Sequence, residues 1–181
     1  MELKLQQNNI LLRAFKSSEI KILYDLIDGN REHLGRWLDW VDKTKTIKDT
    51  QKFFQDESAR YKRGEGIYLG IWFENKLTGV ISFNYINKIH KSAAIGYWLG
   101  KEYEGKGIMF TACKLLMEYG FKKLKLHRID ITHAEGNERS ENLIRKLGFV
   151  HEGHLRKSSI VNGEFTDHEY YGILADEWTR Q

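Results

Sequence analysis

Apolar residues along the chain follow two periods, and each period predicts one kind of element. Alternating or continuous apolar runs bounded by turn residues predict strands at 10–15, 67–73, 77–85, 94–99, 128–134, 150–158 and 166–174. Apolar residues three and four positions apart predict helices from 17 or 18, over 30–41, from 46, over 108–120 and over 137–147. Most strands follow one another as hairpins, with one strand–helix–strand crossover. This order predicts an α+β fold with a mixed, mostly antiparallel sheet of about seven strands.

Cap and turn residues predict where these elements begin and end. Ser17 or Ser18 is expected to cap the first helix, and Thr46 with Asp49 predicts a capping box at the helix that follows 30–41. The pair at 162–163, Asn-Gly, predicts the turn of the last hairpin. No repeat, low-complexity tract or linker interrupts the pattern. Residues 1–181 are therefore predicted to form a single domain.

The strand at 94–99 leads into a glycine-rich turn and then an amphipathic helix. The turn spans 100–107 and the helix is expected to open at Ile108. The first N–H groups of a helix have no intrahelical partner, and the helix dipole places about +0.5 charge there. Glycine also lets an anion approach the backbone without meeting a Cβ atom. This stretch therefore predicts an anion site, although a glycine turn without a ligand fits the same residues.

Three phosphate-binding motifs match this turn in part. The P-loop pattern lacks its Ser or Thr, because Gly107 stands in that place. The dinucleotide fingerprint has Phe110 where its third glycine belongs. The pyrophosphate loop of GNAT N-acetyltransferases, [QR]-x-x-G-x-[GA], matches at Gly105 and Gly107 but has Glu102 in its first position. The turn alone leaves these alternatives open.

A second motif lies on the helix at 137–147. Asn137 is a good N-cap residue, and Ser140 shares one helix face with Leu143, Ile144 and Leu147. Ser140 thus places a hydroxyl group on the inward face, one turn from the helix start. The alternative is a core serine that bonds back to a backbone carbonyl.

Composition narrows the class of protein. The 181 residues include no proline and one cysteine, and the net charge is +4. Cys113 alone excludes an internal disulfide and a cysteine-cluster metal site, and it is expected to be a small core residue. The histidines lack a metal-ligand spacing, so no metal is predicted. Without a signal peptide or a membrane-length apolar run, we expect a cytoplasmic protein that binds neither a membrane nor, directly, nucleic acid.

Two spaced motifs identify a family resemblance. The pattern Y-x-G-K-G-I-M at 103–109, followed by N-x-x-S-x-x-L-x-x-K-L-G-F at 137–149, resembles the GNAT superfamily of N-acetyltransferases. Segments at 30–41, 152–158 and 162–174 are similar to its ribosomal-protein serine N-acetyltransferase branch. The resemblance covers essentially the whole chain. It implies a sheet whose two central strands splay apart at a bulge, with helices on both faces and acetyl-CoA in the cleft.

The resemblance also implies a cofactor site. The backbone of Trp98 and Leu99 would pair with the pantetheine arm, and Asn137 would bond the cofactor near its reactive end. The pyrophosphate would be held by the backbone N–H groups of Gly105, Lys106, Gly107, Ile108 and Met109.

The chemistry implied is attack of a neutral amine on the acetyl thioester. Ser140 would be the acid that protonates the leaving thiolate, because Ile144 occupies the position of the tyrosine found in many members. Ser159 occupies the position of the glutamate base of related enzymes. An N-terminal α-amine, with a pKa of about 7.7–8.0 against about 10.4 for lysine, needs a weaker base. Candidate relays are Glu138, Glu152, Glu164, Asp167 and His168.

The acceptor side is expected to be walled by the segment at 30–41. It carries Arg31, His33, Trp37 and Trp40, although ordinary core packing and surface charge explain these residues more readily. The predicted function is an acetyl-CoA-dependent N-acetyltransferase that acts on a protein N-terminus, with a ribosomal protein as the leading candidate. The alternatives are a small-amine N-acetyltransferase, a catalytically decayed CoA- or ribosome-binding module and a P-loop nucleotidase. Family members often form dimers, and the sequence leaves the subunit number open.

Overall fold

The chain folds around one eight-stranded sheet with helices on both faces. We describe a computed structural model that covers residues 4–161 and 163–178. The strands are β1 (Lys4–Gln7), β2 (Ile10–Arg13), β3 (Ile67–Phe73), β4 (Lys76–Asn87), β5 (Ser92–Leu99), β6 (Arg128–Ala134), β7 (Val150–Val161) and β8 (Glu164–Leu174). The helices are α1 (Ile20–Asp28), α2 (Arg31–Gly35), α3 (Ile47–Arg63), α4 (Ile108–Lys122), α5 (Glu138–Lys146) and α6 (Ala175–Trp178).

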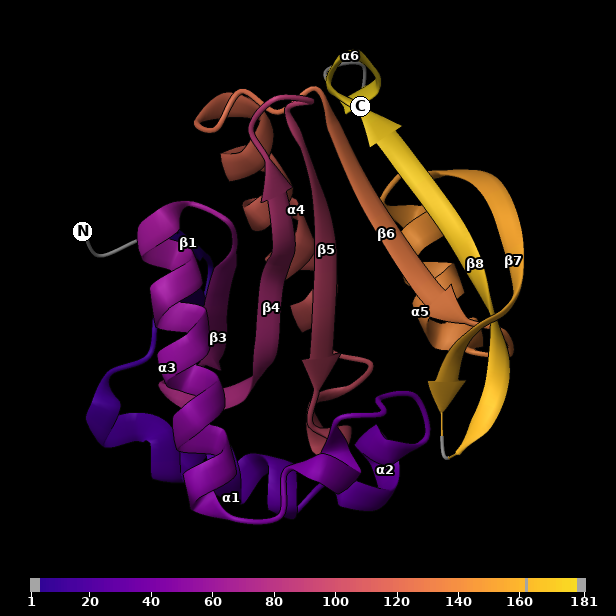
Figure 1. Ribbon diagram of the computed structural model, residues 1–181. Helices are drawn as coiled ribbons and strands as arrows, with labels where there is room; N and C mark the ends of the chain where they lie inside the picture. Colours follow the sequence, from indigo (N-terminus) through magenta and orange to yellow (C-terminus); the bar gives the residue numbers. More distant parts are fainter. Residues whose placement is uncertain (1–3, 162, 179–181) are drawn as a thin grey trace.

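The sheet has the order β1-β2-β3-β4-β5-β6-β8-β7 (Figure 1). Every pairing is antiparallel except that of β5 with β6, which is parallel. A parallel pair needs a crossover, and α4 supplies it. The predicted α+β class and mixed, mostly antiparallel sheet are therefore confirmed, with one strand more than expected.

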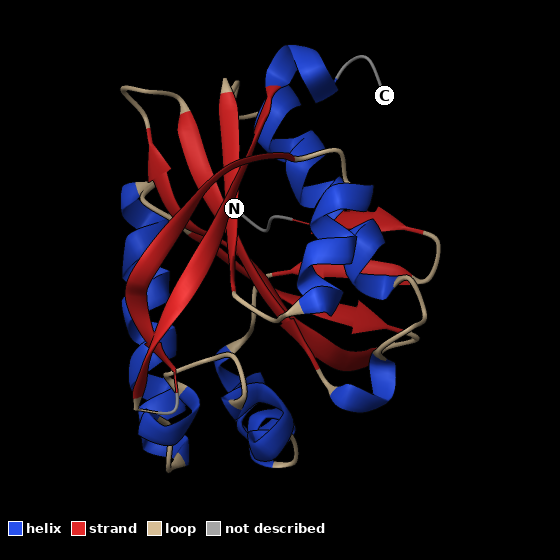
Figure 2. Ribbon diagram, turned by 90° about the vertical axis from the view of Figure 1, so that its right-hand side faces the viewer, coloured by secondary structure: helices blue, strands red, loops and turns tan. Residues whose placement is uncertain are grey.

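Two hydrophobic layers hold the helices to the sheet, and Figure 2 shows helices on both of its faces. On one face, α4 buries Ile108, Leu116 and Met117 against the strands. On the other face, α1 packs Leu23 and Ile27 against Trp72, Val80 and Trp98. Cys113 is fully buried in the α4 layer, as expected of a small core residue.

Residues close in sequence define where the first helices begin and end. The Thr46 N–H donates to Asp49 Oδ2 at 2.7 Å, which confirms the capping box. Gly64 ends the helix with φ of +69°, a conformation that glycine adopts at no steric cost. The expected serine cap of the first helix is wrong, because the Glu19 carboxylate instead accepts the Lys16 N–H at 2.8 Å.

Three further elements differ from the sequence pattern. β1 has the polar sequence Lys-Leu-Gln-Gln and shows no apolar period, so only its pairing with β2 reveals it as a strand. The segment expected to be helical over 30–41 is divided into α2 and a 3₁₀ turn at Val41–Lys43. The predicted turn at 162–163 lies partly outside the described residues, since Asn162 is not among them.

Candidate active site

The central strands separate halfway along their length. β6 pairs with β5 only from Ser92 to Ile95, and β5 then continues to Leu99 paired with β4 alone (Figure 1). The irregularity that accompanies the splay lies in the neighbouring strand, where Asn84 is an extra residue between Phe83 and Tyr85 of β4. The last residues of β5 therefore have no strand partner on the β6 side.

Backbone direction decides which residues of β5 face this open edge. The Gly100 N–H donates to the Thr78 carbonyl of the β4 side at 2.8 Å. Because backbone groups alternate along a strand, Trp98 also turns its N–H and C=O toward β4. Tyr97 and Leu99 turn theirs toward the open edge. The backbone of Leu99 thus faces the open edge and that of Trp98 faces β4, and the cofactor contacts expected of both residues stay predictions.

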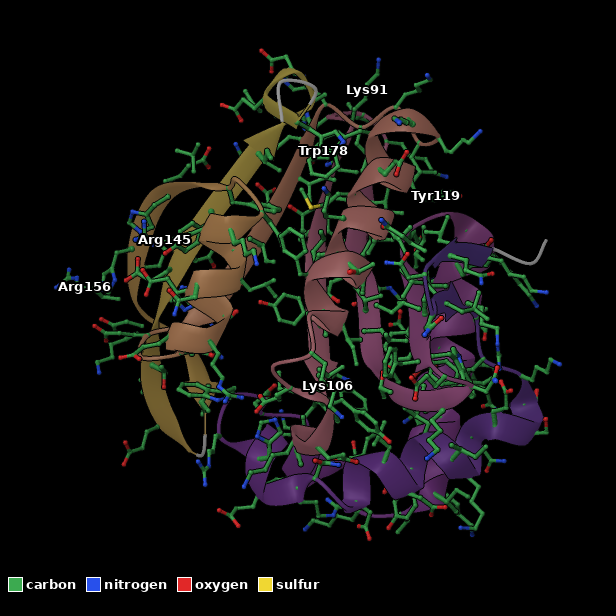
Figure 3. The ribbon with its side chains drawn as sticks, turned by 180° about the vertical axis from the view of Figure 1, so that it is seen from behind. Lys91, Lys106, Tyr119, Arg145, Arg156 and Trp178 are labelled. Carbon is green, nitrogen blue, oxygen red and sulfur yellow. The ribbon has the colours of Figure 1, made fainter. Side chains whose placement is uncertain are left out.

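The turn before α4 presents a row of free donors. Gly105 and Gly107 have φ of +74° and +72°, and open space surrounds the position of a Cβ at each. Among the described residues, no group accepts the backbone N–H of residues 105–110, and the first bonded one is Thr111, which donates to the Gly107 carbonyl at 3.1 Å. Lys106 lies in this turn, at the N-terminal end of α4 (Figure 3). These features fit a diphosphate group.

The helix α5 brings a hydroxyl group to the same edge. The Asn137 side chain caps α5 by accepting the Ser140 N–H at 3.2 Å. Ser140 is only 9% exposed, and its Oγ lies 2.6 Å from the Tyr97 hydroxyl oxygen. Burial raises the pKa of Tyr97, so its phenol remains protonated and available as a donor.

Tyr97 is a site residue that the sequence reasoning missed. The alternation of β5 placed positions 95, 97 and 99 on one face, and Ile95 is buried in the α4 layer. That signal could have placed the Tyr97 ring beside α4. It could not have shown that Ser140, which is 43 residues away in sequence, lies opposite it.

Charged residues surround the start of the glycine turn. Glu104 forms an ion pair with Arg139, and the His33 Nε2 lies 3.5 Å from the same carboxylate. Burial lowers the pKa of His33. Glu102, in the position where the family has Gln or Arg, is exposed beside Gly100. The turn therefore combines free N–H donors with acidic neighbours at its first half.

The opposite face of the sheet carries a pocket of about 300 Å³ between α1, α3 and the strands. Its wall includes Trp40, whose ring centroid is 6.1 Å from that of Trp98. Arg31 lies outside the lining, where it donates to the Val41 and Thr44 carbonyls and braces the loop that carries Trp40. Of the four residues expected on the acceptor side, Trp40 is thus the one that lines this pocket.

The five candidate proton relays lie outside the lining of this pocket. Glu152 is paired with Arg128, and Asp167 is paired with His154 at 2.9 Å. The His168 Nδ1 is buried without a described partner. None of the five candidates is among the described residues that line the pocket. Nor, in residues 4–161 and 163–178, do three His, Cys, Asp or Glu side chains gather as metal ligands.

This fold and site define an acyltransferase of the GNAT type. The model of the acetyltransferase (GNAT) domain family matches residues 9–150, and the chain belongs to this family. The chain is 36% identical to YdaF of Bacillus subtilis over 172 residues, which cover 94% of this chain and 93% of the relative. It is 32% identical to the ribosomal-protein-serine acetyltransferase of Escherichia coli over 165 residues, or 91% of this chain and 92% of that one.

Further relatives bear on the acceptor and on the cofactor. The spermidine N(1)-acetyltransferase of Escherichia coli is 34% identical over 160 residues, which cover 87% of this chain and 82% of the relative. A solved structure of RimL, a ribosomal L7/L12 α-N-protein acetyltransferase in complex with coenzyme A, superposes with a TM-score of 0.93. It is 29% identical, and the match covers 97% of this chain and 99% of that chain.

Proposed function

We propose that this chain transfers the acetyl group of acetyl-CoA to the N-terminal α-amine of a protein, with a ribosomal protein as the leading acceptor. The observation that carries the proposal is the contact of Ser140 with Tyr97 beside an open strand edge, together with the free N–H groups at 105–110. The relatives that act on ribosomal proteins support the acceptor class. We place this activity in the cytoplasm as one domain, without direct contact to nucleic acid.

In this proposal backbone groups bind acetyl-CoA, and a side chain positions Ser140. The N–H groups of Gly105, Lys106, Gly107, Ile108 and Met109 hold the diphosphate. The Leu99 and Tyr97 backbone groups pair with the amide-bearing arm, as an added strand pairs with a sheet edge. The Asn137 amide keeps the first turn of α5, and therefore Ser140, in place. Acetyl-CoA, when bound, supplies an activated thioester.

Proton transfer is the task of the two hydroxyl groups. The Ser140 Oγ–H is the donor for the departing sulfur, and the Tyr97 O–H donates to Ser140 Oγ. The raised pKa of Tyr97 keeps the phenol neutral at neutral pH, so this donor is present throughout the working range. The α-amine, with a pKa of about 7.7–8.0, loses one proton to water before it attacks. As the C–N bond forms and the C–S bond breaks, the nitrogen loses a second proton, which restores the Ser140 hydroxyl group after that group has protonated the sulfur.

The test combines cofactor binding with turnover. We expect saturable binding of acetyl-CoA by calorimetry, and thiol release with peptides that begin with the N-terminal sequences of ribosomal proteins. Ser140→Ala should lower kcat by about 100-fold, the lower end for loss of a general acid, with little change in acetyl-CoA affinity. Ser158→Ala, at an exposed position on β7, is the matched control. Equal loss of binding and turnover in Ser140→Ala would make Ser140 a structural residue, and no saturable binding would end the proposal.

A small amine is the second candidate acceptor, favoured by the spermidine N(1)-acetyltransferase relative. Mass spectrometry of peptides and of spermidine, each incubated with enzyme and acetyl-CoA, separates the two candidates. Acetylation of spermidine alone would replace the protein acceptor.

A further inference from the structure

The pocket between α1, α3 and the sheet lies next to the open strand, on the face opposite α4. Three consecutive residues of β5, Gly96, Tyr97 and Trp98, take part in its lining. These are the residues that follow the splay from β6. A group held in this pocket therefore lies against the segment of β5 that the proposed function gives to the thioester arm.

One carboxylate serves this pocket. Glu57 is the acidic residue among the described residues of the lining, and its side chain is 10% exposed. Its Oε1 accepts from Arg60 Nη1 at 2.7 Å, while no described group donates to Oε2. A carboxylate can accept several hydrogen bonds, so Oε2 retains capacity for a further donor. Because the side chain is mostly withdrawn from water, an added cation interacts with it more strongly than at the surface.

The rest of the wall is uncharged and combines aromatic rings with aliphatic and small polar side chains. Trp40 and Trp98 lie 6.1 Å apart between ring centroids, and Phe53 and Tyr68 lie 5.0 Å apart. Aromatic faces attract ammonium groups, and Phe53 remains 44% exposed. Burial, with a further contribution from Glu57, raises the pKa of Tyr68, so the phenol stays neutral. The charges in the lining are thus those of Glu57 and Arg60.

We propose that this pocket, which we name the amine pocket, binds the terminal ammonium group and first residue of the acceptor through Glu57 Oε2. This assignment rests on the proposed function. A volume of about 300 Å³ is at the lower end for small-molecule sites, so the amine pocket suits one small terminal residue of a longer chain. Glu57 is here a binding residue that draws the amine to β5. It performs no covalent step.

The direct test is the binding of an octapeptide that begins with serine, measured by tryptophan fluorescence with coenzyme A present. The probe is used with a free and with an acetylated N-terminus, because acetylation removes the charge and leaves the rest unchanged. We expect the wild-type enzyme to bind the free peptide at least about tenfold more tightly, as for a hydrogen bond to a charged group. Glu57→Gln should lose this preference, and Glu57→Asp, which keeps the charge, should retain part of it.

Arg60→Gln is the matched control, because it breaks the same ion pair from the other side. If Glu57 binds the ammonium, Arg60→Gln removes a competing cation, and the free peptide binds as tightly as before or more tightly. If Glu57 serves only as the partner of Arg60, both variants weaken binding and lower the unfolding midpoint alike, which would overturn the assignment.

Turnover separates failure of this inference from failure of the proposed function. A wild-type enzyme that acetylates the peptide, with the same KM for it in Glu57→Gln, would keep the function and reject the amine pocket. A wild-type enzyme that prefers the free peptide but transfers no acetyl group would keep the pocket and reject the function. The enzyme could instead bind spermidine tightly and show no preference for the free over the acetylated peptide. That result would show that the amine pocket does not hold the terminal residue of a peptide.

Discussion

Two hydroxyl groups on different elements face each other beside the open edge of β5. Ser140 is almost fully buried, and Tyr97 reaches it from the strand at 2.6 Å. A serine on the inner face of a helix usually bonds back to its own backbone. Here its described side-chain partner is the phenol, which orients the hydroxyl group across the space between β5 and α5. Tyr97 is therefore a positioning residue for Ser140.

Tyr97→Phe tests this pairing. The variant keeps the ring and loses one hydrogen bond, so we expect kcat to fall about fivefold, equivalent to about 1 kcal/mol, with an unchanged KM for acetyl-CoA. The double variant with Ser140→Ala should be no worse than Ser140→Ala alone, because both act on the same proton. Steady-state kinetics on the four enzymes measures this coupling. Losses that multiply would show that the two hydroxyl groups act independently.

At the scale of elements, the turn before α4 depends on two glycines in left-handed conformation. Gly105 and Gly107 direct successive N–H groups into open space, and α4 begins immediately afterwards. The space around them would accommodate a methyl group, so conformation rather than crowding requires glycine at both positions. A left-handed conformation costs other residues about 1–2 kcal/mol.

Gly107→Ala is expected to weaken acetyl-CoA binding. The turn either keeps its strained φ or relaxes and turns the donors away, and the second response raises the Kd by about fivefold or more. Calorimetry with acetyl-CoA measures the effect. Gly64→Ala is the control, because Gly64 also has positive φ but ends α3, and its added Cβ meets only the flexible end of Lys88. It should lose stability to a similar degree with unchanged affinity, and an equal loss of affinity in both variants would refute the role of the turn.

At the scale of the whole molecule, the long β7–β8 hairpin forms the edge of the sheet beyond the splay. It is held on its outer surface by a charged cluster in which His154 contacts Glu169 at 2.6 Å and Asp167 at 2.9 Å. The hydrogen bonds to Glu169 and Asp167 raise the pKa of His154. The Asp167 carboxylate accepts a hydrogen bond from the Lys157 backbone N–H, which lowers the pKa of Asp167. The hydrogen bond from His154 lowers the pKa of Glu169.

These shifts predict a pH-dependent stability. A raised histidine pKa contributes stability that is complete below about pH 6.5 and is lost as the pH rises through the folded-state pKa. The lowered carboxylate pKa values contribute above about pH 4 and are lost below it. The cluster thus stabilises the fold most between these limits. Urea unfolding should give a larger drop in the free energy of unfolding from pH 6 to pH 9 for wild type than for His154→Gln.

His90→Gln is the control for this measurement, since His90 is exposed in the turn between β4 and β5. It should reproduce the wild-type drop. If His154→Gln also shows the full drop, the cluster does not contribute to stability through this titration. High salt should reduce the difference between wild type and His154→Gln, because exposed charges are screened.

No helix in residues 4–161 or 163–178 is long and apolar enough to span a membrane.

The central layer was predictable because α4 and its strands carry apolar residues at regular spacing. β1 was not predicted, because its four residues are mostly polar and exposed and only its pairing with β2 makes it a strand. The segment over 30–41 has the apolar spacing of one helix, but α2 ends at Gly35. The chain turns there, and Trp40 packs against Trp98.

The sequence by itself determined the features that depend on neighbours along the chain. These are the periods of the helices and strands, the caps at Thr46 and Asn137, and the glycine turn before α4. Only the tertiary structure decided that Tyr97 meets Ser140 and that Glu57 lines a pocket beside β5. Those contacts depend on the order of the strands and on the separation of β5 from β6. They join residues far apart in sequence, and no local period or spacing fixes such distances.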